Sequence, residues 1–371
     1  MIRLSKSCLS KIEKDKVLSI LDKEYLGMGH EVEQFEYELS NYFSRPVACV
    51  SSGTAALHLA LQALGLENDD EVLVQTITYV GSFQAIVASG ARPVACDVDP
   101  STMTIDLKDA EKRLTKKTKA LMLVHYAGGV GNLGEAYTFA KKNNLRVIED
   151  AAHAFGTVYN NSLVGSKSDI ACFSFDGIKN ITSGEGGCIT TNDRTLLKQV
   201  ADTRLLGVEN DTDARFQNSR TWEFDVKKIG WRYHMSDIMA AIGRAQLSRF
   251  EELSNKRRLI AKYYDASFCD QQRVSFFKQD YDAIVPHIYP VRIAGLTLET
   301  REALRNKLNK KGIQVGIHYQ PNHLLSLFSD VKAQPINNAE AIYPELLSLP
   351  LHPDIEKSDV DRVVSTLLEL V

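Results

Sequence analysis

The sequence Cys172-Phe-Ser-Phe-Asp-Gly-Ile-Lys179-Asn-Ile-Thr-Ser-Gly-Glu-Gly-Gly187-Cys-Ile-Thr190 joins two apolar runs through a loop with a single lysine. The pattern predicts a strand, a catalytic loop and a return strand. Lys179 lies among Phe, Ile and Gly, and such surroundings disfavour the charged amine and lower its pKa. A neutral amine can form a Schiff base with a carbonyl compound. A solvated loop lysine is the alternative, because most lysines are exposed.

Upstream of this stretch, apolar runs alternate with segments of helical spacing. The runs that predict strands are residues 47–50, 71–74, 93–96, 119–125 and 145–150. Because each run is continuously apolar, we expect an α/β fold with a mostly parallel central sheet and helices on both faces. Ligands of such sheets bind beyond the carboxyl ends of the strands. The candidates for one shared crevice are therefore Ser51 to Thr54, Tyr79, His125, Asp150, His153 and Lys179.

The length of 371 residues suggests two domains, or one large domain with an appendage. A charged segment from Leu253 to Ala266 predicts a long helix that leads into the second domain. We place the boundary near Phe250, with a large domain over residues 1–250 and a smaller C-terminal α/β domain over residues 251–371. The N-terminal helix is the segment of the first domain that could pack on the second.

Within the small domain, residues 284–293 and 314–318 are expected to form strands and residues 299–310 a helix. The last helix is expected to begin at Ser358, a plausible N-cap, and to end at Leu370.

Composition excludes several classes of function. The net charge of −3 gives no general attraction to nucleic acid or to an anionic membrane. Six cysteines form no C-x-x-C pair, and several lie in apolar runs, which predicts free thiols in a reducing compartment. No N-terminal apolar h-region appears, and no apolar run is long enough to span a bilayer. The sequence predicts a cytoplasmic protein that binds neither nucleic acid nor membrane.

Ser51-Ser-Gly-Thr54 joins a predicted strand to a predicted helix. Backbone N–H groups and the positive end of a helix make such a junction a seat for phosphate. Gly53 allows close approach of the backbone, and Thr54 adds a hydroxyl. A plain helix cap is the alternative, because Ser and Thr are common caps.

Asp150-Ala-Ala-His153 follows a buried strand. A carboxylate in that position requires a charged or hydrogen-bonding partner. A protonated pyridine nitrogen is one such partner, and the pairing makes the ring a better electron sink. The alternatives are an N-cap for Asp150 and a structural histidine at position 153.

Gly129-Val-Gly131-Asn-Leu-Gly134 fits the dinucleotide fingerprint G-x-G-x-x-G, with acids at Glu149 and Asp150 about twenty residues later. It is the best evidence for another class of enzyme, a nicotinamide-dependent oxidoreductase. Extra residues precede the first glycine, and several strand–helix units precede the motif, which usually opens its domain. A glycine-rich turn that needs positive φ explains it equally well.

Several motifs occur together in one order and with one spacing. They are Gly53-Thr54, Tyr79, Asp150-Ala-Ala-His153, Phe173-Ser-Phe-(x)3-Lys179, Gly184-Glu-Gly-Gly187 and Tyr233-His-Met-Ser-Asp-Ile238. Jointly they resemble the DegT/StrS-type sugar aminotransferases, pyridoxal phosphate enzymes of fold type I that act on nucleotide-linked keto sugars. The resemblance covers nearly the whole chain. Near the C-terminus, Gly316-Ile-His318-Tyr-Gln-Pro-Asn-His323 and Leu347-Ser-Leu-Pro-Leu-His-Pro353 also resemble family signatures.

The resemblance implies a role for each matching residue around pyridoxal 5'-phosphate. Lys179 would hold the cofactor as a Schiff base and then move the proton. Asp150 would pair with the pyridinium nitrogen, His153 would lie near the phenolic oxygen, and Tyr79 would stack on the ring. The phosphate would be bound by Gly53, Thr54 and Ser174.

The resemblance also implies substrate contacts and a dimer. His318, Tyr319 and His323 would approach the sugar nucleotide, and Glu185 would shape the loop at the site. Where the family usually has Gly-Tyr-Asn-Tyr-Arg-Met, this chain has Gly230-Trp-Arg-Tyr-His-Met235. The family asparagine, which reaches the phosphate in the neighbouring subunit, is Arg232 here, and arginine also binds phosphate through charge-assisted bonds. A homodimer with shared active sites follows from this pattern.

By this resemblance the enzyme transfers the amino group of L-glutamate to a nucleotide-linked keto sugar. The expected acceptor is dTDP-4-dehydro-6-deoxy-D-glucose, and the expected product is a 4-amino sugar for O-antigen or another surface polysaccharide. A 3-keto sugar aminotransferase of the same family is the alternative. Lys179 argues against the dehydratase branch, in which histidine replaces the lysine. A pyridoxal phosphate lyase and a non-catalytic regulator on the same fold remain open.

Overall fold

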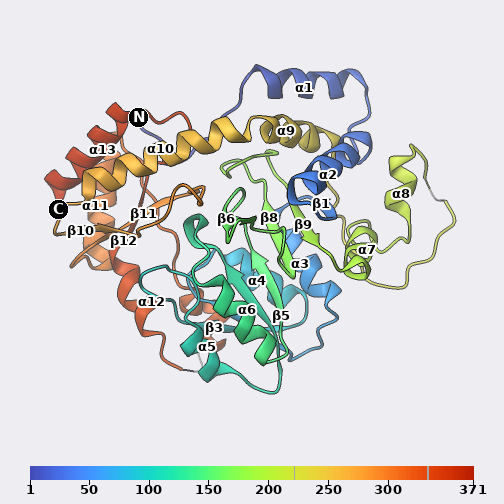
Figure 1. Cartoon of the computed structure of the whole chain (residues 1–371), viewed down its shortest axis with the longest axis horizontal. Helices are drawn as coiled ribbons and strands as arrows, with labels where there is room; N and C mark the ends of the chain where they lie inside the picture. The colour runs from blue at the N-terminus through green and yellow to red at the C-terminus, as the bar shows by residue number, and fades with distance from the viewer. Residues whose placement is uncertain (221, 332–333) are drawn as a thin grey trace.

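The computed structural model describes residues 1–220, 222–331 and 334–371 (Figure 1). Its central sheet has the order β1-β9-β8-β5-β4-β2-β3. The strands are β1 (Val47–Val50), β2 (Glu71–Gln75), β3 (Arg92–Cys96), β4 (Thr118–Val124), β5 (Arg146–Asp150), β8 (Ile170–Ser174) and β9 (Gly187–Thr191). Only β9 runs against its neighbours β1 and β8 among these strands. The predicted α/β class with a mostly parallel sheet is confirmed.

Alternate strand residues are buried on opposite faces of this sheet. Val72 and Val74 belong to the core under α3 (Gly53–Ala63), α4 (Val80–Ala88) and α7 (Arg194–Thr203). Leu73, between them, belongs to the core on the other face. That face is covered by α2 (His30–Phe43), α5 (Leu107–Arg113), α6 (Leu133–Lys142) and α9 (Asp237–Ser248). Burial on both faces explains why the strands are apolar throughout.

The smaller domain has its own antiparallel sheet and its own core. Its strands are β10 (Val274–Phe276), β11 (Tyr289–Ile293) and β12 (Leu346–Leu349), packed against α10 (Phe250–Phe268), α11 (Leu298–Lys310) and α13 (Lys357–Leu370). The long helix α10 leads from the large domain into the small one (Figure 1). The first residues of the chain pack in this domain, because Ile2 forms a β-bridge with Ile313 and is buried in the same core. Helix α1 (Lys11–Asp22) instead packs on α9.

The remaining elements are short. They are α8 (Asp211–Phe216), the hairpin β6 (Val158–Tyr159) and β7 (Ser162–Leu163), α12 (Asn337–Ile342), and the 3-10 helices η1 (Tyr126–Gly128), η2 (Asn322–Leu324), η3 (Ser326–Val331) and η4 (Tyr343–Glu345). Among the described residues, no helix combines the length and the apolarity needed to cross a bilayer.

Three expectations for the small domain are wrong. Residues 284–288 are not part of a strand, because their backbone contacts the large domain: Asn180 donates to the Val285 carbonyl at 3.2 Å. Residues 314–318 form no strand, because Gln314 donates its N–H to Ile2 while Gly316 bridges Ser348. The last helix has Glu356 as its N-cap, and the Glu356 N–H donates to the Asp359 carboxylate at 3.1 Å.

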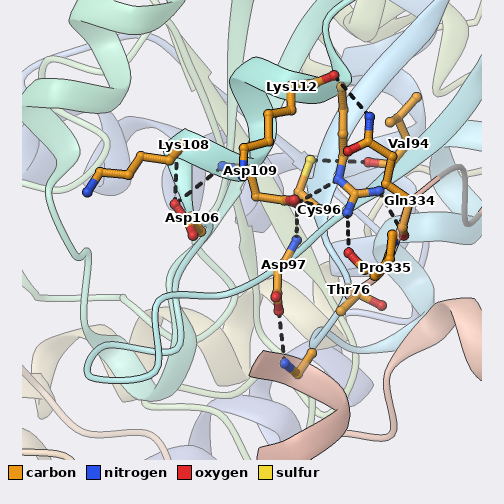
Figure 2. A network of polar contacts seen from close by, with 12 residues as sticks. Thr76, Val94, Cys96, Asp97, Asp106, Lys108, Asp109, Lys112, Gln334 and Pro335 are labelled. Carbon is orange, nitrogen blue, oxygen red and sulfur yellow. Dashed lines mark hydrogen bonds and ion pairs between the residues drawn. The ribbon is translucent and has the colours of Figure 1, made fainter. Parts of the chain in front are cut away.

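The segment before β12 is attached to the large domain by a buried polar network (Figure 2). Asp97, at the end of β3, accepts N–H bonds of 2.8 Å from Asn338 and Ala339 at the start of α12. Arg113 pairs with Asp109 and donates to the Pro335 carbonyl at 3.0 Å. The C-terminal part of the chain therefore crosses back over the large domain before it enters the small sheet.

Candidate active site

A cavity of about 370 Å³ lies beyond the carboxyl ends of the central strands. Its walls come from the start of α3, the β2–α4 turn, the ends of β4, β5 and β8, and the 176–185 loop. His318 and Tyr319 reach it from the segment that follows α11. The location is the one expected for the ligand of an open parallel sheet.

The start of α3 supplies backbone N–H groups and a hydroxyl to this cavity. Ser52 is the N-cap and accepts the Ala55 N–H at 3.0 Å. A Cβ atom at Gly53 would lie 2.7 Å from the Cβ of Ser174, so only glycine lets these two segments approach. Thr54 and Ser174 both line the wall. The helix end and the two hydroxyls form a seat for an anion.

Asp150 is a buried carboxyl at the end of β5. One oxygen accepts the Ser82 hydroxyl at 2.7 Å and the other accepts the Ala152 N–H at 3.2 Å. Burial raises the pKa of Asp150, and these two bonds and the charge of Lys179 oppose that rise. A carboxylate in this setting binds a cationic ring nitrogen strongly.

Lys179 lines the same cavity, and burial lowers its pKa to about 8. Its Nζ lies 3.4 Å from Nε2 of His287, which comes from the segment before β11. Burial and the nearby charge of Lys179 hold the pKa of His287 well below its usual range. The lysine therefore faces a neutral imidazole, and its amine is available as a nucleophile and a base.

Aromatic and imidazole side chains complete the wall. The Tyr319 hydroxyl lies 3.0 Å from Nε2 of His153, and the rings of Tyr79 and Tyr319 are 5.9 Å apart. Burial holds the pKa of His153 well below its usual range, so its ring is neutral. Nδ1 of His153 is buried without a hydrogen-bond partner among the described residues, which leaves it free to bond a ligand.

The structure brings most of the sequence-predicted residues together. Those that line the cavity are Gly53, Thr54, Tyr79, Asp150, His153, Ser174, Lys179, Glu185, His318 and Tyr319. Arg232 is exposed on the segment beside β1 and lies outside this lining. His323 lies outside it too, because its ring nitrogens face Thr76 at 2.7 Å and Glu340 at 3.1 Å. His125 pairs with buried Glu149 instead of facing the cavity.

Three residues of the site were not predicted from the sequence. Ser82 bonds Asp150, His287 faces Lys179, and buried Arg257 donates to the Lys179 carbonyl at 3.4 Å. A signal for Arg257 existed, because it occupies the helical stripe formed by Leu253, Ile260 and Tyr264. Nothing in the local sequence distinguishes His287 from a strand histidine.

The dinucleotide fingerprint does not form a nucleotide site. Helix α6 begins at Leu133, after the N-cap Asn132, so the last glycine of the motif is already helical. Glu149 is bonded to His125 at 2.8 Å and to the Tyr137 hydroxyl at 2.6 Å. Asp150 lines the cavity that also contains Lys179. Neither acid is available to bind a ribose.

The cavity fits pyridoxal phosphate. It contains an anion seat at the start of α3, a buried carboxyl for the ring nitrogen and an amine for the aldehyde, in one lining. The free Nδ1 of His153 is a further polar contact without a protein partner among the described residues. Over the described residues, no cluster of His, Cys, Asp and Glu could hold a metal ion.

Comparison with known proteins identifies the family. The sequence profile of the DegT/DnrJ/EryC1/StrS aminotransferase family matches residues 7–368. GDP-perosamine synthases from Escherichia coli O157:H7 and Caulobacter vibrioides are 36% and 35% identical, over 96% of this chain and 95% and 94% of theirs.

Solved structures agree. PseC of Helicobacter pylori, an aminotransferase involved in the biosynthesis of pseudoaminic acid, has a TM-score of 0.92 at 27% identity, covering 100% of this chain and 98% of its own. The PLP-form of Spr1654 from Streptococcus pneumoniae has a TM-score of 0.90 at 28% identity, with the same coverage. The chain therefore belongs to the DegT/DnrJ/EryC1/StrS aminotransferase family and is a pyridoxal-phosphate-dependent sugar aminotransferase.

Proposed function

We propose that the enzyme transfers the amino group of L-glutamate to C4 of a nucleotide-linked 4-keto-6-deoxy sugar, with dTDP-4-dehydro-6-deoxy-D-glucose as the first candidate acceptor. The product would be a 4-amino sugar for O-antigen or another surface polysaccharide. The observation that carries the proposal is the cavity that unites Lys179, Asp150 and the start of α3. A GDP-linked acceptor is the second candidate, because two relatives are GDP-perosamine synthases.

Each role in the reaction falls to a residue of this cavity. Pyridoxal phosphate, when bound, supplies an electron sink and carries the amino group between the two substrates. Lys179 takes the proton from the donor's α-carbon on Nζ and later returns one to the sugar carbon, because its pKa of about 8 lets the amine exchange between its neutral and protonated forms near the working pH. Asp150 holds the ring nitrogen, and Thr54, Ser174 and the α3 N–H groups hold the phosphate.

The other lining residues bind and orient the substrates. Tyr79 covers the ring, with 60% of its surface exposed at the mouth of the cavity. His318 and Tyr319 face the sugar; His318 is fixed by Ser348 at 2.8 Å. Glu185 is exposed on the loop and borders the entrance. His323 supports this segment through Thr76 instead of contacting the sugar.

The active form we propose is a cytoplasmic homodimer with shared sites. Several large apolar side chains between residues 206 and 229 are exposed in the single chain, which favours a partner surface. They are Leu206 at 49%, Trp222 at 83%, Phe224 at 58%, Val226 at 47% and Ile229 at 74%. Arg232 follows this segment and would reach the phosphate of the partner subunit. The six free cysteines fit a reducing compartment.

A panel of dTDP-, UDP- and GDP-linked 3-keto and 4-keto sugars tests the proposal. The enzyme is incubated with pyridoxal phosphate and L-glutamate, and the product is identified by NMR. We expect amination at C4 with at least one 4-keto acceptor, and Lys179→Ala should lose at least about a thousandfold in turnover. Amination at C3 only, or full activity of Lys179→Ala, would refute the proposal. Ornithine and alanine in place of glutamate test the donor.

A further inference from the structure

Arg257 is a buried cation that none of the roles above uses. It lies on α10, is 2% exposed and is among the largest fully buried side chains. Within the described parts of the chain, no carboxylate lies within ion-pair distance of its guanidinium. Burying a charge without a counterion is costly, so a site that retains one has a reason to do so.

All partners of Arg257 are backbone carbonyls of the active site and its supports. One terminal nitrogen donates to His287 at 3.1 Å and to Leu351 at 3.3 Å. The other donates to Ile178 at 3.3 Å and to Lys179 at 3.4 Å. These carbonyls belong to the lysine loop and to two segments of the small domain. Arg257 therefore connects the main chain that carries the catalytic amine to the main chain that carries its histidine neighbour.

We propose that Arg257 is a positioning residue with two effects. It holds the main chain at Lys179 and the main chain at His287 in a fixed relative position, and its uncompensated positive charge acts on the lysine. The inference rests on the proposed role of Lys179. Arg257 does not line the cavity, so it touches neither substrate nor cofactor. The planar fork of arginine can reach four carbonyls at once, which the single ammonium of lysine cannot do.

The effect of Arg257 on the pKa of Lys179 is seen by comparison with the other charged groups around the lysine. Burial lowers the pKa of Lys179 most, the carboxylates of Asp176 and Asp150 raise it, and the Arg257 charge lowers it. The three neighbouring imidazoles add no charge at neutral pH, because burial lowers the pKa of His153 and His287 well below the usual range and that of His318 to about 4. Arg257 is thus the one permanent cation among the groups that act on the lysine within the described structure.

The neighbours of Arg257 do not cancel this charge. The nearby Cys8 adds no negative charge, because burial raises the pKa of its thiol and keeps it protonated. His352 has a pKa lowered by burial and is neutral. Burial lowers the pKa of Arg257 itself to about 10, so it stays charged at neutral pH.

Two substitutions separate the effect of the hydrogen bonds to the carbonyls from the effect of the positive charge. Arg257→Lys keeps the charge and loses the fork, whereas Arg257→Gln keeps a donor and loses the charge. The matched control is Arg45→Lys, because Arg45 is also a buried arginine that donates only to carbonyls, those of Gly165 and Ser168 at 3.0 Å and 2.6 Å. Thermal unfolding of all variants verifies that they fold.

The decisive readout is competitive acetylation of Lys179 in the full-length, cofactor-free protein, measured by peptide mass spectrometry against pH. We expect the labelling midpoint to rise by roughly a few tenths of a pH unit in Arg257→Gln, because Arg257 is the smallest of the charges that act on Lys179, and to stay in place in Arg257→Lys and in the control. In the loaded enzyme, kcat should fall about tenfold in both Arg257 variants, with KM changed less than about twofold, and the control should be unaffected.

An unshifted midpoint in Arg257→Gln, or a kcat of Arg257→Lys equal to that of the control, overturns the inference. If Arg257→Gln does not fold, the comparison of kcat between Arg257→Lys and Arg45→Lys still tests the positioning role of Arg257. The labelling arm needs no catalysis, so it gives its answer even if Lys179→Ala retains activity and the proposed function fails.

Discussion

At the scale of the residue, the site depends on one lysine whose pKa is lowered toward the working pH. The Lys179 amine has a pKa of about 8, against an ordinary value of 10.5, chiefly because it is buried. His287, whose Nε2 lies 3.4 Å from the Lys179 Nζ, is neutral because burial holds its pKa well below the usual range. A proton acceptor with a pKa near the working pH is the best compromise between availability and basicity.

This lowered pKa has a measurable effect on stability. Between pH 8 and 10.5 the unfolded chain holds a proton on Lys179 that the folded chain has lost, so stability rises with pH in that window. We expect cofactor-free wild type to gain up to about 3 kcal/mol relative to Lys179→Met across the window, with a constant difference below pH 8. Urea unfolding of both proteins at several pH values measures it. A difference independent of pH would mean that the lysine is solvated.

Residues with a strong local signal were the ones that could be predicted from the sequence. Lys179 and Asp150 each follow a buried strand, so the topology alone places them at one edge. His287 gave no such signal, and the place of Arg257 in the apolar stripe of α10 indicated its burial but not its partners, because only the tertiary fold brings both segments to the lysine. His323 carried a family signature, yet its ring is turned toward Thr76.

At the scale of the element, a helix end holds the two parts of the chain together. Asp97 bonds the N–H groups of Asn338 and Ala339, which are free donors at the start of α12 (Figure 2). A carboxylate is also favoured there by the helix dipole. The bond joins β3 of the large domain to a segment more than two hundred residues later.

Asp97→Ala should lower the free energy of unfolding by about 2 to 3 kcal/mol, because two charge-assisted bonds are lost and buried donors are left unpaired. The matched control is Asp106→Ala, a cap within one domain that accepts from Lys108 and Asp109 and should cost about 1 kcal/mol. Urea denaturation of the three proteins gives the values. Equal losses in the two variants would show that Asp97 acts only as a local cap.

Elements of the large domain were predictable, and several of the small domain were not. Continuous apolar runs such as Val47–Val50 have one explanation, a buried strand, and the structure has that strand with the same bounds. The run before Tyr289 also looked like a strand, but Pro286 has no N–H and the Val285 carbonyl is bound to Asn180. Bonds to a distant domain override a local pattern, and the sequence contains no sign of them.

At the scale of the whole molecule, the two domains meet at the cavity, and we propose that two subunits do so as well. The large domain supplies Lys179 and Asp150, while His287 and His318 come from segments beyond residue 280. Arg232 is exposed and lies outside the cavity of its own chain. The proposal therefore assigns it to the site of the partner.

Complementation between Lys179→Ala and Arg232→Ala, at a pyridoxal phosphate concentration that loads the wild type but not Arg232→Ala, tests the shared site. Arg232→Ala should lower the affinity for pyridoxal phosphate about tenfold or more, because a charge-assisted phosphate contact is lost. An equimolar mixture with Lys179→Ala, after subunit exchange, should regain about a quarter of wild-type activity, because half the dimers are mixed and each contains one intact site. Sedimentation confirms that every sample is dimeric. A mixture that stays inactive would contradict sharing, and unchanged cofactor affinity would remove Arg232 from the phosphate site.

The most direct test of the central claim is to locate the cofactor on the chain. The enzyme is loaded with pyridoxal phosphate, reduced with borohydride and digested, and the modified peptide is sequenced by mass spectrometry. The account predicts one modified residue, Lys179, in the peptide that contains Phe173 and Phe175, with no modification in Lys179→Ala. Attachment to any other lysine, or stoichiometric cofactor that reduction leaves unattached, would contradict it.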